Sequence, residues 1–419
     1  GGKKFMNITE KIIAKHAKKE KVVPGEIVEV DVDYCMANDA TICLNIDIFK
    51  NKFGFKKVWD PAKVVFLIEH QLPADSVNTS ESHKKIREFS HAQGVQLHER
   101  DGVCHQVMFE KYVKPGQLIV AADSHTCSYG CLGAFSTGMG STDIAAVMGS
   151  GKTWLKVPET ILVDLSGKLK PGVYAKDVIL KLCGEITAAG ATYKSIEFTG
   201  SLIKNLSISE RFTLCNMVVE MGGKSAMIAP DQTIKECYQA QDIDWKLLQP
   251  DADAKYEKVL KYDVSKLEPQ VACPHFVDNV KNLKELLDTP IDQGFIGSCT
   301  NGRLDDLRIA ARILHHKKIH PNVRLLVTPA SVTVYQRALK EGLIDIFLEA
   351  GAIINHPGCS TCWGACQGVM ASGQTLISTA NRNFKGRAGS PESKIYLASP
   401  ATVAASVVEG KIVDPRRYL

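Results

Sequence analysis

Three cysteines have a spacing that suits a metal cluster. Cys299 lies in the sequence GSCTNGR, and Cys359 and Cys362 form a CxxC pair in PGCSTCWG. Three thiolates can hold three irons of a four-iron cluster and leave the fourth iron open, where it acts as a Lewis acid. The pattern therefore indicates catalysis more than electron transfer, which normally uses four protein thiolates. Two other interpretations are a zinc site with an additional ligand and unliganded core cysteines.

Cys366 offers a fourth thiol in the same segment, CSTCWGAC, one helical turn after Cys362. If Cys366 were a ligand, no open iron would remain and electron transfer would become the better interpretation. We expect Cys366 to be a helix-facing thiol and not a ligand. Other cysteines, such as Cys183 and Cys237, lie in helix-like apolar patterns and are expected to be small buried hydrophobic residues.

A group of polar side chains, Asn381, Arg382 and Arg387, lies in the sequence ANRNFKGR. Forked guanidinium groups bind carboxylates through two parallel hydrogen bonds, which a lysine does poorly. The segment follows a predicted strand, as the cysteine segments do. We therefore expect these side chains to take part in the same functional site.

Three histidines have acidic or polar neighbours. They are His70 after Glu69, His105 in DGVCHQ, and His125 in the run Asp123-Ser124-His125. A carboxylate that accepts from one ring nitrogen fixes the tautomer and stabilises the charged imidazole, as acid-base chemistry requires. The pattern predicts catalytic histidines. Five other histidines are expected on the solvated surface, namely His83, His91, His315, His316 and His320.

Short β-branched runs recur between helical patterns, which is typical of parallel α/β units. Because the runs are apolar throughout, they suit sheets that are covered by helices on both faces. The runs are KVVFLIEH, GQLIVAADSH, ETILVDLSG, DQGFIGSCT, VRLLVTPAS, GAIINHPG, TLISTANRN and KIYLASP. The fold class is predicted as α/β, with three α/β/α domains at residues 1–155, 156–285 and 286–419. Polar loops at several strand ends imply one composite site.

Composition excludes several classes of function. Net charge is only +5 and Lys/Arg runs do not exceed a doublet, so nucleic acid is not an expected partner. No apolar stretch approaches the roughly 20 residues that span a bilayer, so no membrane association is expected. Thirteen cysteines in such a chain favour reduced thiols and a cytoplasmic location.

Together, the motifs GSCTNGR, CxxC, DSHT, GxCHQ and NRNFxGR resemble the aconitase superfamily. Their layout is similar to that of isopropylmalate isomerase large subunits and archaeal homoaconitase-like relatives, over nearly the whole chain. The resemblance implies three aconitase-type domains around a [4Fe-4S] cluster that Cys299, Cys359 and Cys362 hold. It also implies a hydro-lyase whose open iron takes the substrate hydroxyl while a base removes a proton from the neighbouring carbon.

The resemblance assigns roles to the other motif residues. The catalytic histidine-carboxylate group would comprise Glu69, His70, His105, Asp123, His125 and Glu197, with Glu197 of SIEFTG as the partner of His125. The substrate-binding group would comprise Asn38, Asp39 and Thr41 of ANDAT, Ser124, Asn381, Arg382 and Arg387. The arginines and Asn381 would hold substrate carboxylates or the surroundings of the cluster.

Four departures from the family pattern bear on the substrate. Asn38 stands where a larger polar side chain is usual, and Glu69 replaces the usual aspartate of the Asp-His pair. Thr361 and Trp363 in the cysteine loop are also atypical. Isopropylmalate is the leading substrate. The alternatives are a short branched malate, such as 2-methylmalate or 2,3-dimethylmalate, homoaconitate, and a non-catalytic RNA-binding regulator.

A small partner subunit is expected from the same resemblance. Single-chain aconitases continue into a further, swivelling domain that supplies a serine base, whereas this sequence ends at DPRRYL soon after its last α/β unit. We expect a separate small subunit to supply that domain and that base.

Overall fold

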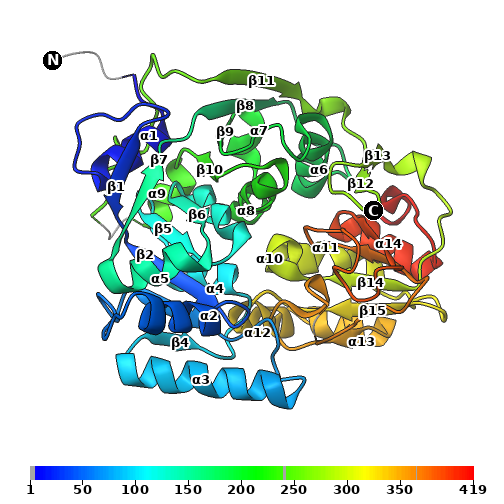
Figure 1. The fold of residues 1–419 in the computed structure, drawn as a ribbon. Coiled ribbons are helices and arrows are strands. Elements are labelled where there is room, and N and C mark those ends of the chain that lie inside the picture. The colour runs from blue at the N-terminus through cyan, green and yellow to red at the C-terminus, as the bar shows by residue number, and fades with distance from the viewer. Residues whose placement is uncertain (1–4, 239–241, 365) are drawn as a thin grey trace.

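Three large sheets and one two-stranded ribbon organise the computed structural model, which describes residues 5–238, 242–364 and 366–419. Figure 1 shows the first sheet and its helices in blue and cyan, the second in green, and the third in yellow to red. Helices α4, α8 and α10 meet at the centre of the molecule, between the sheets. The predicted α/β fold class is confirmed.

The first sheet has five strands in the order β4-β3-β2-β5-β6, and all its neighbouring strands are parallel. The strands are β2 (Tyr34–Asn38), β3 (Val64–Leu67), β4 (Gln96–His98), β5 (Leu118–Ala121) and β6 (Phe135–Gly138). Its helical segments are α2 (Ile42–Asp47), α3 (Val77–Gln93), α4 (Cys104–Lys111), η2 (Ser124–Leu132) and α5 (Ser141–Ser150). Every residue of β3 and β5 is buried, as expected for strands covered on both faces.

The second sheet has four parallel strands in the order β10-β9-β8-β11. The strands are β8 (Thr160–Ser166), β9 (Ser195–Thr199), β10 (Ser225–Ile228) and β11 (Lys258–Asp263). The helical segments of this region are α6 (Ala175–Ile186), α7 (Ser201–Asn205), α8 (Ile208–Asn216), η3 (Met217–Met221) and α9 (Gln232–Cys237).

The third sheet has seven strands in the order β13-β12-β18-β17-β14-β15-β16. Two short strands at one edge are antiparallel, β12 (Gln270–Ala272) and β13 (Val280–Asn282). The parallel strands are β14 (Gln293–Ile296), β15 (Arg324–Val327), β16 (Ile353–Ile354), β17 (Thr375–Ser378) and β18 (Lys394–Leu397). The principal helices are α10 (Ser298–Asn301), α11 (Leu304–Leu314), α12 (Val332–Lys340), α13 (Leu343–Ala350) and α14 (Pro400–Glu409).

The antiparallel ribbon pairs β1 (Ile27–Asp31) with β7 (Lys152–Lys156), and α1 (Ile8–His16) precedes it. All eight strand runs predicted from the sequence are strands. The chain passes from the ribbon to the second sheet at residues 157–159 and from the second sheet to the third at residues 264–269. Strands β12 and β13 therefore belong to the third sheet although they precede residue 285. The division into domains stays a prediction.

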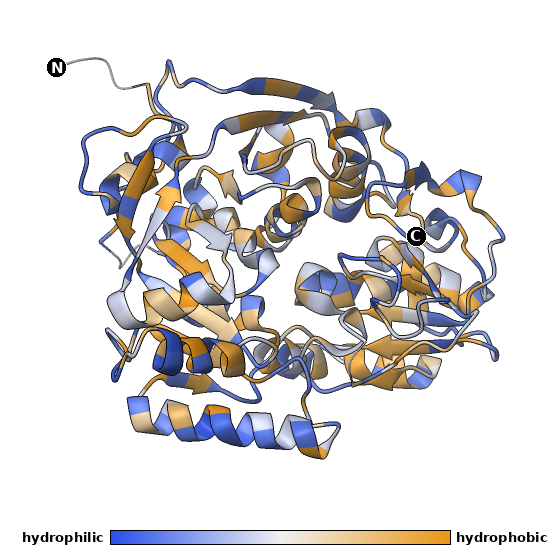
Figure 2. Cartoon of the chain, in the orientation of Figure 1, coloured by the Kyte–Doolittle hydropathy of each residue, from blue (hydrophilic) through white to orange (hydrophobic). Residues whose placement is uncertain are grey.

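The elements end where local chemistry requires. Helix α3 begins after Ser76, whose hydroxyl accepts from the Thr79 N–H group, and ends at Gly94 in the left-handed conformation at φ 72°. Figure 2 shows α3 as a mainly hydrophilic helix on the outside of the first sheet, whereas the central strands are hydrophobic. Among the described residues, no helix combines the length and apolar character that a membrane crossing requires.

Candidate active site

The polar loops predicted to form one site meet between the first and third sheets. Glu69 and His70 follow β3, whereas Cys359 follows β16 of the other sheet. The Cys359 N–H group donates to Glu69 Oε2 at 3.0 Å and is 3.2 Å from the Glu69 carbonyl oxygen. The His70 ring contacts Trp363 edge to face, with 5.1 Å between ring centroids. Loops far apart in the sequence are therefore held together by direct contacts.

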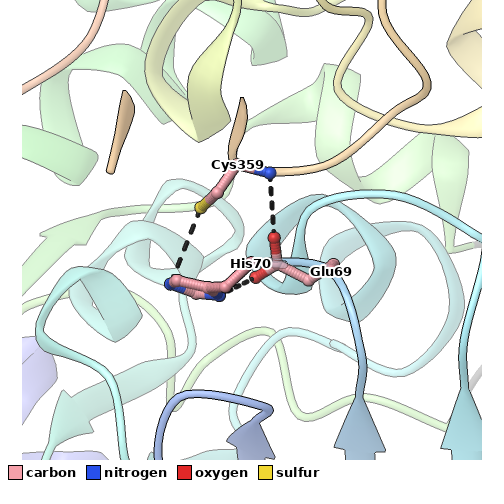
Figure 3. Close-up of side chains that lie close together, drawn as sticks. All are labelled: Glu69, His70 and Cys359. Carbon is pink, nitrogen blue, oxygen red and sulfur yellow. Dashed lines mark hydrogen bonds and ion pairs between the residues drawn. The ribbon is translucent and has the colours of Figure 1, made fainter. Parts of the chain in front are cut away.

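His70 lies between a carboxylate and a thiol. Its Nδ1 is 2.7 Å from Glu69 Oε1, and its Nε2 is 3.7 Å from the Cys359 sulfur (Figure 3). Burial opposes the charged imidazole, but the Cys359 and Glu69 charges raise the pKa of His70 well above its usual value. Glu69 thus directs the second ring nitrogen of His70 toward the cysteine loop.

Asp39 organises the loop that carries these two residues. Its Oδ1 accepts from the backbone N–H groups of Glu69 (3.1 Å) and His70 (2.9 Å), and its Oδ2 accepts from that of Gln71 (3.0 Å). His83 Nε2 lies 3.4 Å from Asp39 Oδ2. These contacts show that Asp39 holds the loop of Glu69 and His70 in place. Substrate binding by Asp39 stays a prediction.

The prediction that His83 lies on the solvated surface is wrong. Only 2% of His83 is exposed. The sequence of α3 is mostly hydrophilic, so its pattern did not reveal that this histidine faces a buried aspartate. Cys237 was also predicted wrongly, since it is exposed at the end of α9, whereas Cys183 is buried as expected.

Asp123 connects two predicted site residues. Its Oδ1 is 2.7 Å from His105 Nε2, and its Oδ2 accepts from Asn38 Nδ2 at 2.9 Å. His105 Nδ1 lies 3.0 Å from the Tyr129 hydroxyl, so both ring nitrogens of His105 have partners. Burial opposes ionisation, yet the neighbouring His105 holds the pKa of Asp123 well below its usual range. The Thr41 hydroxyl donates to the Asn38 carbonyl oxygen at 3.2 Å and fixes this loop.

His125 pairs with Glu220, not with Glu197. His125 Nε2 is 2.8 Å from Glu220 Oε1, and Arg382 Nε donates to the same oxygen at 2.8 Å. The predicted partner Glu197 lies on β9 and accepts from the Tyr256 hydroxyl at 2.9 Å instead. The prediction of this pair was wrong because sequence order does not show which way a residue of β9 faces.

Glu220 is the site residue that sequence reasoning missed. It ends the apolar run NMVVE immediately before Met221 and two glycines, and an acidic residue at that place was the available signal. Burial opposes ionisation, but the hydrogen bond from His125 and the charge of Arg382 lower the pKa of Glu220. Burial and Arg382 lower the pKa of His125. The Ser124 hydroxyl lies 3.3 Å from His125 Nδ1, the nitrogen that faces away from Glu220.

A cavity of about 410 Å³ lies beside Asp123 and Ser124. Asp123 and Ser124 line it together with Gly138, Asp143 and Lys224. The predicted residues Asp123 and Ser124 are therefore placed beside a space that a small molecule can enter.

The three predicted cluster cysteines are buried free thiols, with 5–7% of each residue exposed. Cys299 and Cys359 belong to one apolar cluster with Val103 and Ala330, against which Trp363 packs. Burial raises the pKa of Cys299 to about 12, and the neighbouring Cys362 acts in the same direction.

Polar N–H groups point at these sulfurs. Asn216 Nδ2 and Asn381 Nδ2 lie 3.2 Å and 3.5 Å from the Cys299 sulfur, and Arg387 Nη2 lies 3.9 Å from that of Cys362. Such donors stabilise thiolates rather than neutral thiols. Asn216 was not predicted as a site residue.

Cys366 does not continue a helix, which corrects our expectation of a helix-facing thiol. Ser360–Cys362 form a short 3₁₀ turn, and Cys366 lies in a bend, where its thiol donates to the His70 carbonyl oxygen at 3.4 Å. Its role as a non-ligand stays a prediction.

Comparisons with known proteins agree with this geometry. Residues 10–290 and 279–410 match the sequence model of the aconitase family (aconitate hydratase). The chain is 50% identical to 3-isopropylmalate dehydratase large subunit 1 of Methanopyrus kandleri and to the protein of the same name from Archaeoglobus fulgidus. Each of these two matches covers 98% of this chain and 99% of the relative.

A third relative has a different name. The probable methanogen homoaconitase large subunit of Methanothermobacter thermautotrophicus is 46% identical, with 98% of both chains covered. Among solved structures, aconitase X of Thermococcus kodakaraensis in its holo-form matches with a TM-score of 0.52 and 14% identity over 84% of each chain, which supports the fold alone. From the family match and these relatives, the chain belongs to the aconitase family of hydro-lyases.

Proposed function

We propose that this chain is the iron-sulfur large subunit of a dehydratase that interconverts hydroxy acids, with 3-isopropylmalate as its substrate. The observation that carries the proposal is the meeting of three free cysteines with three histidine-carboxylate pairs and two arginines. The two relatives at 50% identity bear the name of that enzyme's large subunit.

The residues present fit a [4Fe-4S] cluster held by Cys299, Cys359 and Cys362. All three are reduced, and amide or guanidinium donors face the sulfurs of Cys299 and Cys362. Three protein thiolates leave one iron without a protein ligand. When bound, the cluster would supply a Lewis acid that weakens the bond between the substrate carbon and its hydroxyl.

The arginines of the NRNFxGR motif would bind the substrate carboxylates. Arg387 Nε is buried and has no hydrogen-bond partner among the residues that the structure describes. A buried donor without a partner costs about 1–3 kcal/mol, so a ligand oxygen at this place would be favourable. Arg382 is tied to Glu220, which orients its guanidinium group.

The histidine pairs would move protons. Glu69 Oε1 lies 2.7 Å from Nδ1 of His70 and forms an ion pair with it, so Nε2 is the nitrogen that would hold a proton for the leaving hydroxide. Glu220 fixes His125 in the same manner, and Nδ1 of His125 then faces Ser124. Asp123 contacts both Asn38 and His105, so it holds these two side chains in place.

Two features favour an apolar substituent on the substrate over the further carboxylate of homoaconitate. Val103 and Ala330 form an apolar cluster around Cys299 and Cys359, and the indole of Trp363 packs against it. A third carboxylate would need a cation there, and apolar side chains offer none. The isopropyl group of isopropylmalate suits such a surface.

A small subunit would complete the enzyme. The relatives are named as large subunits, which implies a partner chain. We propose that the partner supplies a serine base and a swivelling domain, since proton removal next to a carboxylate needs a base within hydrogen-bond reach.

The test is an assay of the anaerobically reconstituted chain with and without the small chain from the same genome. The appearance of alkene absorbance would be followed with isopropylmalate, 2-methylmalate and 2,3-dimethylmalate, and its loss on hydration would be followed with homoaconitate. We expect turnover only in the mixture, with isopropylmalate preferred, and four irons per chain. Faster turnover of another acid would show that this acid, and not isopropylmalate, is the substrate. Full turnover by the large chain alone would refute the divided site, and stoichiometric zinc without iron would refute the cluster.

A further inference from the structure

Lys176 is a fully buried lysine in the first turn of α6, with an exposure of 0%. The N-terminus of a helix carries a partial positive charge, which disfavours a cation there. A buried charge also costs much free energy unless it is hydrogen-bonded or paired. The local sequence does not explain why a lysine is buried at this position, so the explanation must lie in its tertiary contacts.

Among the described residues, Lys176 donates to three oxygen atoms. Its Nζ donates to Asn301 Oδ1 at 3.0 Å, to the Thr379 carbonyl oxygen at 2.5 Å and to the Ala380 carbonyl oxygen at 2.8 Å. An ammonium group has three N–H donors and a neutral amine has only two. Three acceptors around one nitrogen therefore match the charged form.

These oxygens belong to the two segments that carry the site. Asn301 lies in α10 with Cys299, whereas Thr379 and Ala380 directly precede Asn381. The orientation of the Asn301 side chain follows from its other contacts, because its Nδ2 donates to Asp306 Oδ1 at 2.9 Å and to Thr213 Oγ1 at 3.3 Å and leaves Oδ1 for the lysine. One ammonium group of a helix from the second region thus bridges α10 and the loop that follows β17, both in the region of the third sheet.

We propose that Lys176 is a positioning residue for the cluster, since its ammonium group ties the Cys299 segment to the Asn381 segment and offsets part of the negative charge of the cysteine thiolates. The inference rests on the proposed function, because it assumes a bound cluster. It differs from the roles given above to the cysteines and arginines, since in the part of the chain that the structure describes the hydrogen bonds of Lys176 go to Asn301, Thr379 and Ala380 and not to a cysteine sulfur.

The electrostatics are consistent with this role. Burial lowers the pKa of Lys176 to about 7, and the charges of Asp306 and the Cys362 thiolate act in the opposite direction. Thiolates that hold a cluster carry their charge permanently, so they would favour the ammonium form.

The experiment compares Lys176→Met and Lys176→Arg with Lys181→Met in the full chain after anaerobic reconstitution. Lys181 is the matched control, because it lies on the same helix but is exposed and pairs only with Glu185 in the contacts that the structure describes. The measurements are iron content, the rate of iron release in air followed by electron paramagnetic resonance, and the midpoint potential of the cluster.

Lys176→Met should release iron about 10- to 100-fold faster, as removal of supporting contacts around a metal site typically does. Its midpoint potential should be more negative, because a lost positive charge disfavours the reduced cluster. Lys176→Arg should keep the midpoint potential close to that of the wild type. Lys181→Met should match the wild type in both the rate of iron release and the midpoint potential.

A folded Lys176→Met chain with wild-type iron release and potential would overturn the inference. If this variant does not fold, Lys176→Gln decides, because its amide keeps hydrogen-bond donors without the charge. A potential unchanged in Lys176→Gln would then overturn the inference. These outcomes are distinct from failure of the proposed function, which would appear as a wild-type chain that binds no iron.

Discussion

Two largely buried glutamates, Glu220 and Glu197, have opposite surroundings. Glu220 accepts hydrogen bonds from His125 and Arg382, and its pKa is lowered despite burial. Glu197 accepts from the neutral Tyr256 hydroxyl and has one carboxylate oxygen without a partner among the described residues. Burial raises the pKa of Glu197 to about 7, and the nearby Glu10 acts in the same direction.

The difference shows what makes a buried carboxyl group functional in this molecule. Burial alone favours the neutral form, as it does for Glu197. The hydrogen bond from His125 and the charge of Arg382 keep Glu220 ionised in the same low-dielectric interior, and an ionised carboxylate can fix a histidine for proton transfer.

The largest expected effect concerns two cysteines of the proposed active site, to which Glu220 also belongs and Glu197 does not. Cys359→Ser should lose the cluster, whereas Cys366→Ser should retain four irons per chain, since the Cys366 thiol contacts the His70 carbonyl oxygen. Iron analysis after anaerobic reconstitution is the measurement. Equal loss of iron in both variants would show that Cys366 is a ligand and would favour electron transfer.

The direct test of the contrast compares Glu220→Gln with Glu197→Gln. Glu220→Gln should lower kcat by roughly 10²- to 10⁴-fold, the usual contribution of acid-base groups, because His125 loses its charged partner. Glu197→Gln should change kcat little, since Glu197 contacts Tyr256 and not His125. Both variants would be assayed with the small chain present. Similar losses of kcat would end the distinction between the two glutamates.

A smaller effect is expected from Arg387→Lys. The loss of one charge-assisted hydrogen bond, about 1.5–3 kcal/mol, would raise KM for the hydroxy acid roughly 10- to 150-fold. Arg308→Lys is the matched control, because Arg308 is exposed and pairs with Asp305 and Glu341. An unchanged KM in Arg387→Lys would exclude Arg387 from carboxylate binding.

The smallest effect is a pH dependence of stability that originates from Glu197. Its carboxyl group has a pKa of about 7 in the folded chain against 4.5 for the free side chain. The folded state therefore binds more protons between these values, so the free energy of unfolding should fall as pH rises from about 4.5 to about 7. The difference is on the order of 3 kcal/mol.

Thermal unfolding of the cluster-free chain at pH 5 and pH 8 measures this effect. The midpoint should be lower at pH 8, and Glu197→Gln should reduce the difference because the amide does not ionise. A Glu197→Gln chain with the same pH dependence as the wild type would show that Glu197 is ionised in the folded state, as Glu220 is.

The sequence by itself indicated eight of the strands and the cysteine and arginine motifs of this protein, although strands such as β2 and β9 were not among those predicted. In the run KVVFLIEH the stretch VVFLI is apolar because β3 is buried on both faces, and polar residues follow because parallel strands end beside the site. Both properties are local, so they are visible in one segment at a time.

Only the tertiary structure decided which side chains became partners. Glu220, not Glu197, faces His125, His83 is buried against Asp39, and Lys176 reaches across to Asn301. Each of these contacts joins elements from different parts of the chain, and the sequence of one element does not state which face it presents to another. The physical reason is that a buried charge is stable only with specific partners, and packing of the three sheets brings those partners together.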